Sequence, residues 1–124
     1  MKRSMTPPAA DTVLAKLLVA VDALRGAHRR HAFEHASWDF VELLAQLPDY
    51  PADAFTDSDV ARIRLLAEDV VLRIEERVAE DEESTRITMQ LVLAVYAIRS
   101  RLEQIELWRR HAQTESRKSL EAGG

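Results

Sequence analysis

The segment ITMQLVLAVYAIRSRLEQIELW, residues 87–108, decides the fold of this chain and contains neither glycine nor proline. At about 100° per residue on a helical wheel, one set of its apolar side chains falls within about a third of a turn. The set comprises Ile87, Leu91, Ala94, Val95, Ile98, Leu102 and Ile105. A continuous stripe of this kind predicts an amphipathic helix whose apolar face lies in a protein core.

A second apolar group lies nearly opposite the first on the same predicted helix. Met89, Leu93 and Tyr96 form this group, and Leu107 joins it further along. A helix that is apolar on two sides must be sandwiched by its own chain or covered by a partner. Because so short a chain offers few other helices, we expect a partner surface here. The alternative is a central helix that is enclosed within one bundle.

The composition favours an all-α fold. The 124 residues include only three glycines, two of them at the chain end, and four prolines, so we expect long elements and few turns. The absence of cysteine excludes disulfides, thiolate metal sites and cysteine nucleophiles. No apolar run approaches the roughly 20 residues that span a bilayer, and we expect a soluble cytoplasmic protein without a cofactor.

The net charge of −4 hides an uneven distribution of charge along the chain. Residues 1–35 carry six basic and three acidic side chains, residues 36–83 carry four and fourteen, and residues 84–124 carry seven and four. An acidic middle between basic ends would suit head-to-tail self-association or a basic partner, and solvated helix faces are the simpler alternative. Binding of the whole molecule to nucleic acid is not expected at this charge.

The region before the loop at residues 48–57 predicts either two helices or one kinked helix. Residues 1–10, with two adjacent prolines, are expected to form a flexible leader. The apolar stripe that follows changes its phase beyond Gly26, a residue that costs about 1 kcal/mol inside a helix relative to alanine. We therefore expect the first helical region to be kinked or split near Gly26.

The next helix carries the most regular stripe in the chain, over residues 60–78. Thr56 or Ser58 is expected to cap its start. Leu65 and Leu72 lie seven residues apart on its other side. They could form a second contact surface, or they could simply be two exposed leucines. The polar residues 79–84 predict the turn into the central helix.

The expected architecture is an antiparallel bundle of about four helices joined by short loops. Residues 11–113 would form this single domain. Residues 114–124, TESRKSLEAGG, are polar and end in two glycines, and they predict a flexible tail.

Residue types that carry chemistry are concentrated in residues 25–35, RGAHRRHAFEH. His28, His31 and His35 have i, i+3, i+7 spacing and would share one face of a helix, so they are an alternative metal site. No HExxH or ExxH pair on another helix would complete such a site, and we expect no bound metal.

Residues 30–35, RHAFEH, resemble the R-x4–6-H signature of HEPN-domain ribonucleases. Members of that family are all-α, of similar length and usually dimeric, and their Arg and His lie at the dimer cleft. The resemblance implies that Arg30 would stabilise phosphate charge and that His35 would take part in proton transfer on the RNA backbone.

A simpler interpretation of the same segment is a basic helix end. Arg25, Arg29, Arg30 and His31 follow the first predicted helix, where cations interact favourably with the C-terminal end of the helix dipole. On this interpretation the segment holds no catalytic residue, and we do not expect an enzyme.

The sequence thus predicts a helical protein–protein interaction module, such as an adaptor, a chaperone-like protein or a regulatory inhibitor, acting as a homodimer. It would dock by helix faces through Met89, Leu93, Tyr96, Leu107, Leu65 and Leu72. The alternative is a HEPN-like ribonuclease or another histidine-dependent site that uses Arg30, His31 and His35.

Overall fold

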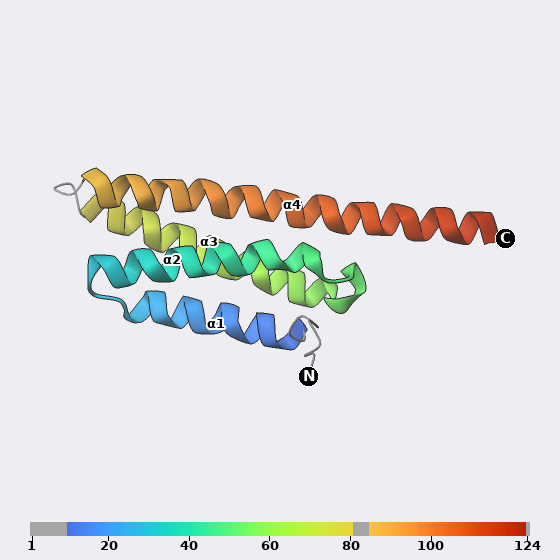
Figure 1. Ribbon diagram of the computed structural model, residues 1–124, viewed down its shortest axis with the longest axis horizontal. Coiled ribbons are helices and arrows are strands. Elements are labelled where there is room, and N and C mark those ends of the chain that lie inside the picture. The colour runs from blue at the N-terminus through green and yellow to red at the C-terminus, as the bar shows by residue number, and fades with distance from the viewer. Residues whose placement is uncertain (1–9, 81–84, 124) are drawn as a thin grey trace, which may run out of the picture.

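The part of the chain that the structure describes, residues 10–80 and 85–123, is almost entirely helical in the computed structural model (Figure 1). No strand occurs among these residues, and the predicted all-α fold is confirmed. Four α-helices share a common long axis: α1 Ala10–Gly26, α2 Arg30–Gln46, α3 Asp57–Glu80 and α4 Thr85–Gly123. Two short 3-10 turns, η1 Leu47–Asp49 and η2 Ala52–Ala54, join α2 to α3.

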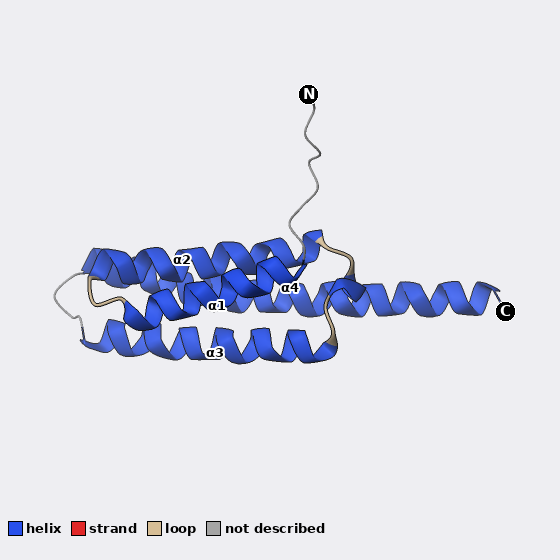
Figure 2. Cartoon of the chain, turned by 90° about the horizontal axis from the view of Figure 1, so that it is seen from below, coloured by secondary structure: helices blue, strands red, loops and turns tan. Residues whose placement is uncertain are grey.

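Helices that are consecutive in the sequence run antiparallel, as predicted, whereas α2 and α4 run in the same direction (Figure 1). The helix α2 packs extensively against both α1 and α4, and α3 packs mainly against α4. Contact between α1 and α3 is sparser. The connection from α2 to α3 therefore crosses the end of the bundle, and α1 and α4 lie between these two helices (Figure 2).

The core contains one apolar stripe from each helix. Leu17, Leu44, Ile74 and Ile98 represent the four helices, and each of these side chains is completely buried. Burying a large aliphatic side chain stabilises the fold by about 1.5–3 kcal/mol. The core face predicted for the central helix is confirmed for the side chains of Leu91, Ala94, Val95, Ile98 and Ile105, which are buried.

The predicted break near Gly26 is confirmed, because α1 ends at Gly26 and α2 begins at Arg30. An arginine of α3 is hydrogen-bonded to the connection between α1 and α2. The guanidinium of Arg77 donates a hydrogen bond of 2.7 Å to the backbone carbonyl of His28. The same group lies 5.3 Å from the centre of the Phe33 ring, within the range of a cation–π interaction.

The start of α3 has reciprocal capping bonds, as predicted for Thr56. The Thr56 amide donates to the Asp59 carboxylate, the Asp59 amide donates to the Thr56 hydroxyl, and both distances are 3.0 Å. These bonds satisfy amides that a helix N-terminus leaves unpaired. The backbone hydrogen bond from Thr56 lowers the pKa of Asp59 below its ordinary value.

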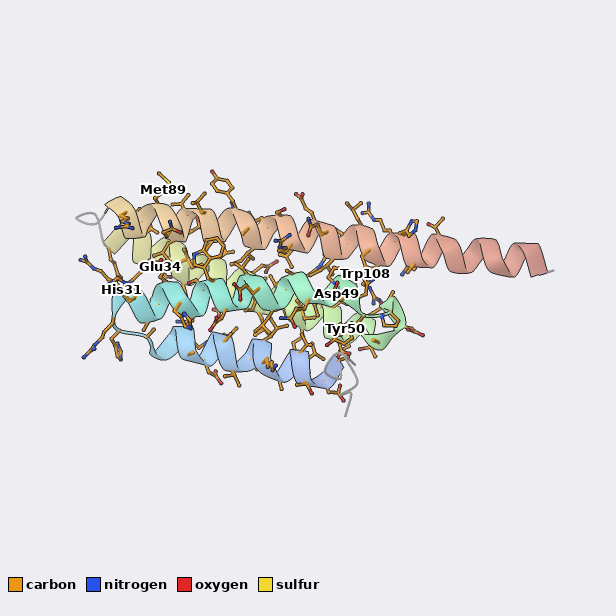
Figure 3. The ribbon with its side chains drawn as sticks, in the orientation of Figure 1. His31, Glu34, Asp49, Tyr50, Met89 and Trp108 are labelled. Atoms are coloured by element: carbon orange, nitrogen blue, oxygen red, sulfur yellow. The ribbon has the colours of Figure 1, made fainter. Side chains whose placement is uncertain are left out.

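The connection between α2 and α3 is held against α4 by one arginine and a group of aromatic rings. Arg109 donates hydrogen bonds to the backbone carbonyls of Ala52 and Phe55, at 3.2 and 3.0 Å, and also contacts the Asp57 carboxylate. The Phe55 ring meets Tyr50 and Trp108 edge-on, with centroid distances of 5.7 and 6.1 Å. Figure 3 shows Tyr50 and Trp108 at this end of the bundle.

The helix α4 is longer than the sequence pattern indicated. Its 39 residues, at a rise of about 1.5 Å each, span about 58 Å, and it extends well beyond the other three helices (Figures 1 and 2). The backbone is helical to Gly123, although residues 114–124 were predicted to form a tail. The predicted leader lies almost wholly outside the described residues, as does most of the predicted turn at 79–84, where α3 continues to Glu80.

Among the described residues, none of the helices combines the length and the apolar character that crossing a bilayer requires. The helices instead alternate buried apolar positions with exposed polar ones, and this is the pattern of a bundle whose outer faces carry charge.

Asp69 of α3 bonds to two arginines, and one of them, Arg25, joins α3 to α1. Its carboxylate accepts hydrogen bonds from Arg25 of α1 at 3.0 Å and from Arg73 of α3 at 3.2 Å. Burial raises the pKa of Asp69, but the bonds from the two arginines outweigh that effect and place the pKa below its ordinary value of 3.8. The ionised form is therefore favoured by folding.

The stabilising effect of Asp69 should therefore depend on pH. Because folding lowers its pKa, the contribution is present above the unfolded-state pKa near 4 and is lost as the pH falls through the lower folded-state value. We expect Asp69→Asn to unfold at lower urea concentration than the wild type at pH 7, and the difference to shrink towards about pH 2.5. An equal difference at both pH values would contradict this account.

The hydrogen bonds from Arg109 should be the main interaction that holds the α2–α3 connection against α4. We expect Arg109→Met to reduce the free energy of unfolding by about 2 kcal/mol, because two carbonyls lose a charged donor. The matched control is Arg110→Met, since the Arg110 side chain is 71% exposed and lies 3.9 Å from the Glu106 carboxylate. In urea denaturation, this control should lose less than about 0.5 kcal/mol of unfolding free energy. Equal losses of unfolding free energy in the two variants would rule out this role for Arg109.

Candidate functional site

The second apolar group of α4 is exposed to solvent along one side of the helix. The exposed fractions are 55% for Met89, 46% for Leu93, 64% for Tyr96 and 62% for Leu107. Figure 3 shows Met89 pointing away from the other three helices. The bundle therefore covers one apolar face of α4 and leaves the second exposed.

Two exposed polar residues complete this row of side chains. With Ser100 and Glu103 included, successive members are separated by four, three, four, three and four residues. We call this row the outer seam of α4, and it consists of Met89, Leu93, Tyr96, Ser100, Glu103 and Leu107. Its centre lies about 180° around the helix from the buried Ile98.

A shallow apolar groove of about 320 Å³ lies between α3 and α4, next to the outer seam. Tyr96 belongs to both features, so the seam and the groove are continuous. The other lining residues are Ile74, Glu75, Val78, Ala79, Val92, Val95 and Arg99. The Arg99 guanidinium and the Glu75 carboxylate, 3.8 Å apart, form an ion pair among them.

Charged side chains also link α3 to α4 further along the seam. The Glu106 carboxylate lies 2.6 Å from the Arg64 guanidinium and 3.9 Å from that of Arg110. The hydrogen bond from Arg64 lowers the pKa of Glu106 below its ordinary value. An apolar row flanked by charge is the arrangement found at many protein interfaces, which have an apolar centre and a polar rim.

The two leucines predicted on α3 are exposed as well. Leu65 is 67% and Leu72 59% exposed, and they lie seven residues apart on one side of the helix. Glu68 is an exposed acidic residue between them in the sequence. Whether these leucines contact a partner stays a prediction.

Exposed apolar residues on α1 were missed in the sequence. Leu18 is 42% exposed and Val19 is 66% exposed. Val19 helps to line a groove of about 350 Å³ between α1 and α2, which also contains polar residues such as Lys16 and Glu42. The unbroken apolar run of residues 17–21, LLVAV, was the available signal, because a helix cannot turn five consecutive residues towards one core.

The structure does not place the three histidines on one helical face. His28 precedes α2, so only His31 and His35 lie on the helix. Within residues 10–80 and 85–123, no three His, Asp or Glu side chains are grouped so that they could hold a metal ion. Nε2 of His35 lies 3.4 Å from the Asp39 carboxylate, and the side chain of His35 is 80% exposed.

The Arg30 and His35 side chains do not converge within the protomer. Five residues on a helix correspond to about 140° of rotation, so the two side chains leave α2 in different directions. A polar hollow of about 200 Å³ lies at this end of the bundle and is lined by residues that include Arg25, His28 and Arg77. Neither Arg30 nor His35 lines it.

The interpretation of this segment as a C-terminal helix end needs correction. Only Arg25 lies in the last turn of α1. Arg29 is instead the N-cap of α2, and Arg30 and His31 begin that helix. Cations at a helix N-terminus oppose the helix dipole, so these residues do not gain the predicted stabilisation.

Comparison of the chain with protein-family models, with curated proteins and with solved structures finds no match. Among the α4 side chains that the structure describes, the large exposed apolar ones all belong to the outer seam, and the apolar groove adjoins it.

The N-terminus of α2 should be open to stabilisation by a single substitution. Arg29 makes no capping hydrogen bond with its side chain, and the first turn contains no acidic residue. We expect Arg29→Asp to raise the free energy of unfolding by about 1 kcal/mol. The aspartate carboxylate can accept a hydrogen bond from a backbone amide in the first turn of α2, and its negative charge interacts favourably with the helix dipole. The matched control Arg29→Ala should show a smaller gain in urea denaturation. No difference between the two variants would contradict the capping argument.

Proposed function

We propose that this chain is a protein–protein interaction module, of the adaptor or regulatory kind, that docks through the outer seam of α4 and forms homodimers. One observation carries the proposal: the seam exposes Met89, Leu93, Tyr96 and Leu107 in a row. The row spans 19 residues, from Met89 to Leu107, or about 27 Å of helix. A cytoplasmic location belongs to the same proposal and comes from the sequence.

The energetics of apolar burial support a docking role. Covering a large apolar side chain is worth about 1.5–3 kcal/mol when it passes from full exposure to full burial, and these four are about half exposed. Tyr96 suits a central anchor, because it combines a large apolar ring with a hydroxyl that can hydrogen-bond at an interface. Exposed apolar side chains gathered on one side of an otherwise charged helix, as Met89, Leu93 and Tyr96 are, are typical of interaction sites.

The charge around the seam supports selectivity rather than affinity. Arg99, Glu103 and Glu106 border or interrupt the apolar row and are solvent-accessible. Exposed charges of this kind contribute little binding energy individually, but like charges brought together disfavour a wrong partner. A partner must therefore match an apolar row and an alternation of positive and negative charge.

A substitution within the seam tests the proposal. We expect Tyr96→Asp to raise the dissociation constant of self-association about thirtyfold or more, because an interface hot spot is worth about 2 kcal/mol or more. Light scattering over a range of protein concentrations measures this constant, and circular dichroism checks that the helices remain.

The matched control is Val19→Asp, which changes an exposed apolar residue on α1, 66% accessible, far from α4's seam in the sequence. It should self-associate like the wild type. Equal weakening by both substitutions, or by neither, would count against docking through the seam.

The ribonuclease alternative makes a different prediction. It requires RNA cleavage that disappears in Arg30→Ala and in His35→Ala, with self-association unchanged. The interaction proposal expects no such cleavage, and an RNA substrate incubated with the wild type and the two variants distinguishes them.

A further inference from the structure

We propose that the occupant of the outer seam is the outer seam of a second copy, packed antiparallel, with the two-fold axis between residues 101 and 102. This inference rests on the proposed function and specifies its partner and geometry. Four observations carry it: the spacing of the seam, the position of its polar residues, the charges beside it and the length of α4.

The spacing of the seam is that of a two-helix coiled coil. Alternating steps of four and three residues give the average of 3.5 at which two α-helices keep one line of contact. The seam of Met89, Leu93, Tyr96, Ser100, Glu103 and Leu107 follows this alternation throughout. A straight helix from another copy of the chain has the same spacing, and the seam is therefore complementary to itself.

The polar residues favour the antiparallel orientation. A parallel pair in register would place each Glu103 opposite its own counterpart, and two carboxylates would repel each other within the contact. In the proposed antiparallel pair, Glu103 lies opposite Ser100 of the second copy, whose hydroxyl can donate to the carboxylate. The same arrangement places Tyr96 opposite Leu107, and this apolar contact occurs twice by symmetry.

The flanking charges select among the antiparallel registers. In the proposed register, Arg99 lies within two residues of Glu106 of the second copy, and the attraction occurs twice. Shifting the pairing by one heptad, so that Met89 faces Leu107, places Arg99 near Arg99 of the second copy. The next shift, in which Leu93 faces Tyr96, sets Arg99 beside the apolar Val92. Only the first of these three registers gives an attractive pair at these positions.

The length of α4 fits the same register. The helix continues beyond the end of the bundle (Figure 1), and residue 114 would lie opposite residue 89 of the second copy. The contact would then extend over about 38 Å, along part of the projecting segment. Because the seam faces away from the core, the two bundles would lie on opposite sides of the α4 pair without obstructing each other.

Distances between spin labels on the full-length dimer test the orientation and the register. The chain has no cysteine, so Gln90→Cys and Gln113→Cys each provide a unique labelling site at an exposed position beside the seam and outside the contact. In the proposed register, the two labels at position 90 should be about 35 Å apart along the helix axis, and those at position 113 also about 35 Å. These two distances together would support the inference.

Other distances would overturn it. A pairing shifted by one heptad predicts about 24 Å at position 90 and about 45 Å at position 113, so the two sites change in opposite directions. A parallel pair predicts short distances, about 10–20 Å, at both sites. Either result would overturn the proposed geometry but leave the interaction module intact, provided that Tyr96→Asp still weakens the dimer.

Two further outcomes separate the inference from the proposed function. A wild type that is monomeric but binds a different protein in a Tyr96-dependent manner would overturn self-pairing alone. A dimer that Tyr96→Asp leaves unchanged would overturn both proposals, because Tyr96 faces the apolar Leu107 of the second copy in the proposed register.

Discussion

The two-sided apolar character of α4 is the constraint on which the rest of the structure depends. Residues on opposite sides of one helix cannot face the same core, so burying Leu91 and Ile98 turns Met89 and Tyr96 outward. The neighbours α2 and α3 cover the inner face, and α1 packs mainly on α2 rather than on α4. Four helices of this length therefore complete one core and leave a second apolar row at the surface.

At each end of the bundle, one arginine donates hydrogen bonds to backbone carbonyls in the connection between two helices. Arg77 bonds to His28 at the α1–α2 connection, and Arg109 bonds to Ala52 and Phe55 at the α2–α3 connection. Backbone carbonyls in connections lack helical partners, and a forked guanidinium can satisfy more than one of them. Residues 25–35, the segment richest in histidine and arginine, therefore have a partly structural role. Arg77 of α3 bonds to the backbone carbonyl of His28 rather than to its imidazole ring.

Much of the fold could be predicted because it depends on local patterns. The number of helices, the break after Gly26, the cap at Thr56 and the core face of α4 each follow from periodicity or from a short capping motif. The exposure of the outer seam could be anticipated from the same wheel. The histidine segment was harder, since a shift of a few residues in the start of α2 removes His28 from the helix and reverses the effect of the dipole on Arg30.

By itself, the sequence determined which residues are apolar, at what period they recur, and hence that α4 has two faces that need cover. Only the tertiary structure decided that the protomer covers one of them, that α2 and α4 lie side by side in parallel, and that α4 projects beyond the bundle. Bonds such as those of Arg77 and Arg109 join residues 49 and 57 positions apart. The physical reason is that spacing along a helix fixes the direction of a side chain, whereas what lies in that direction depends on how all four helices pack.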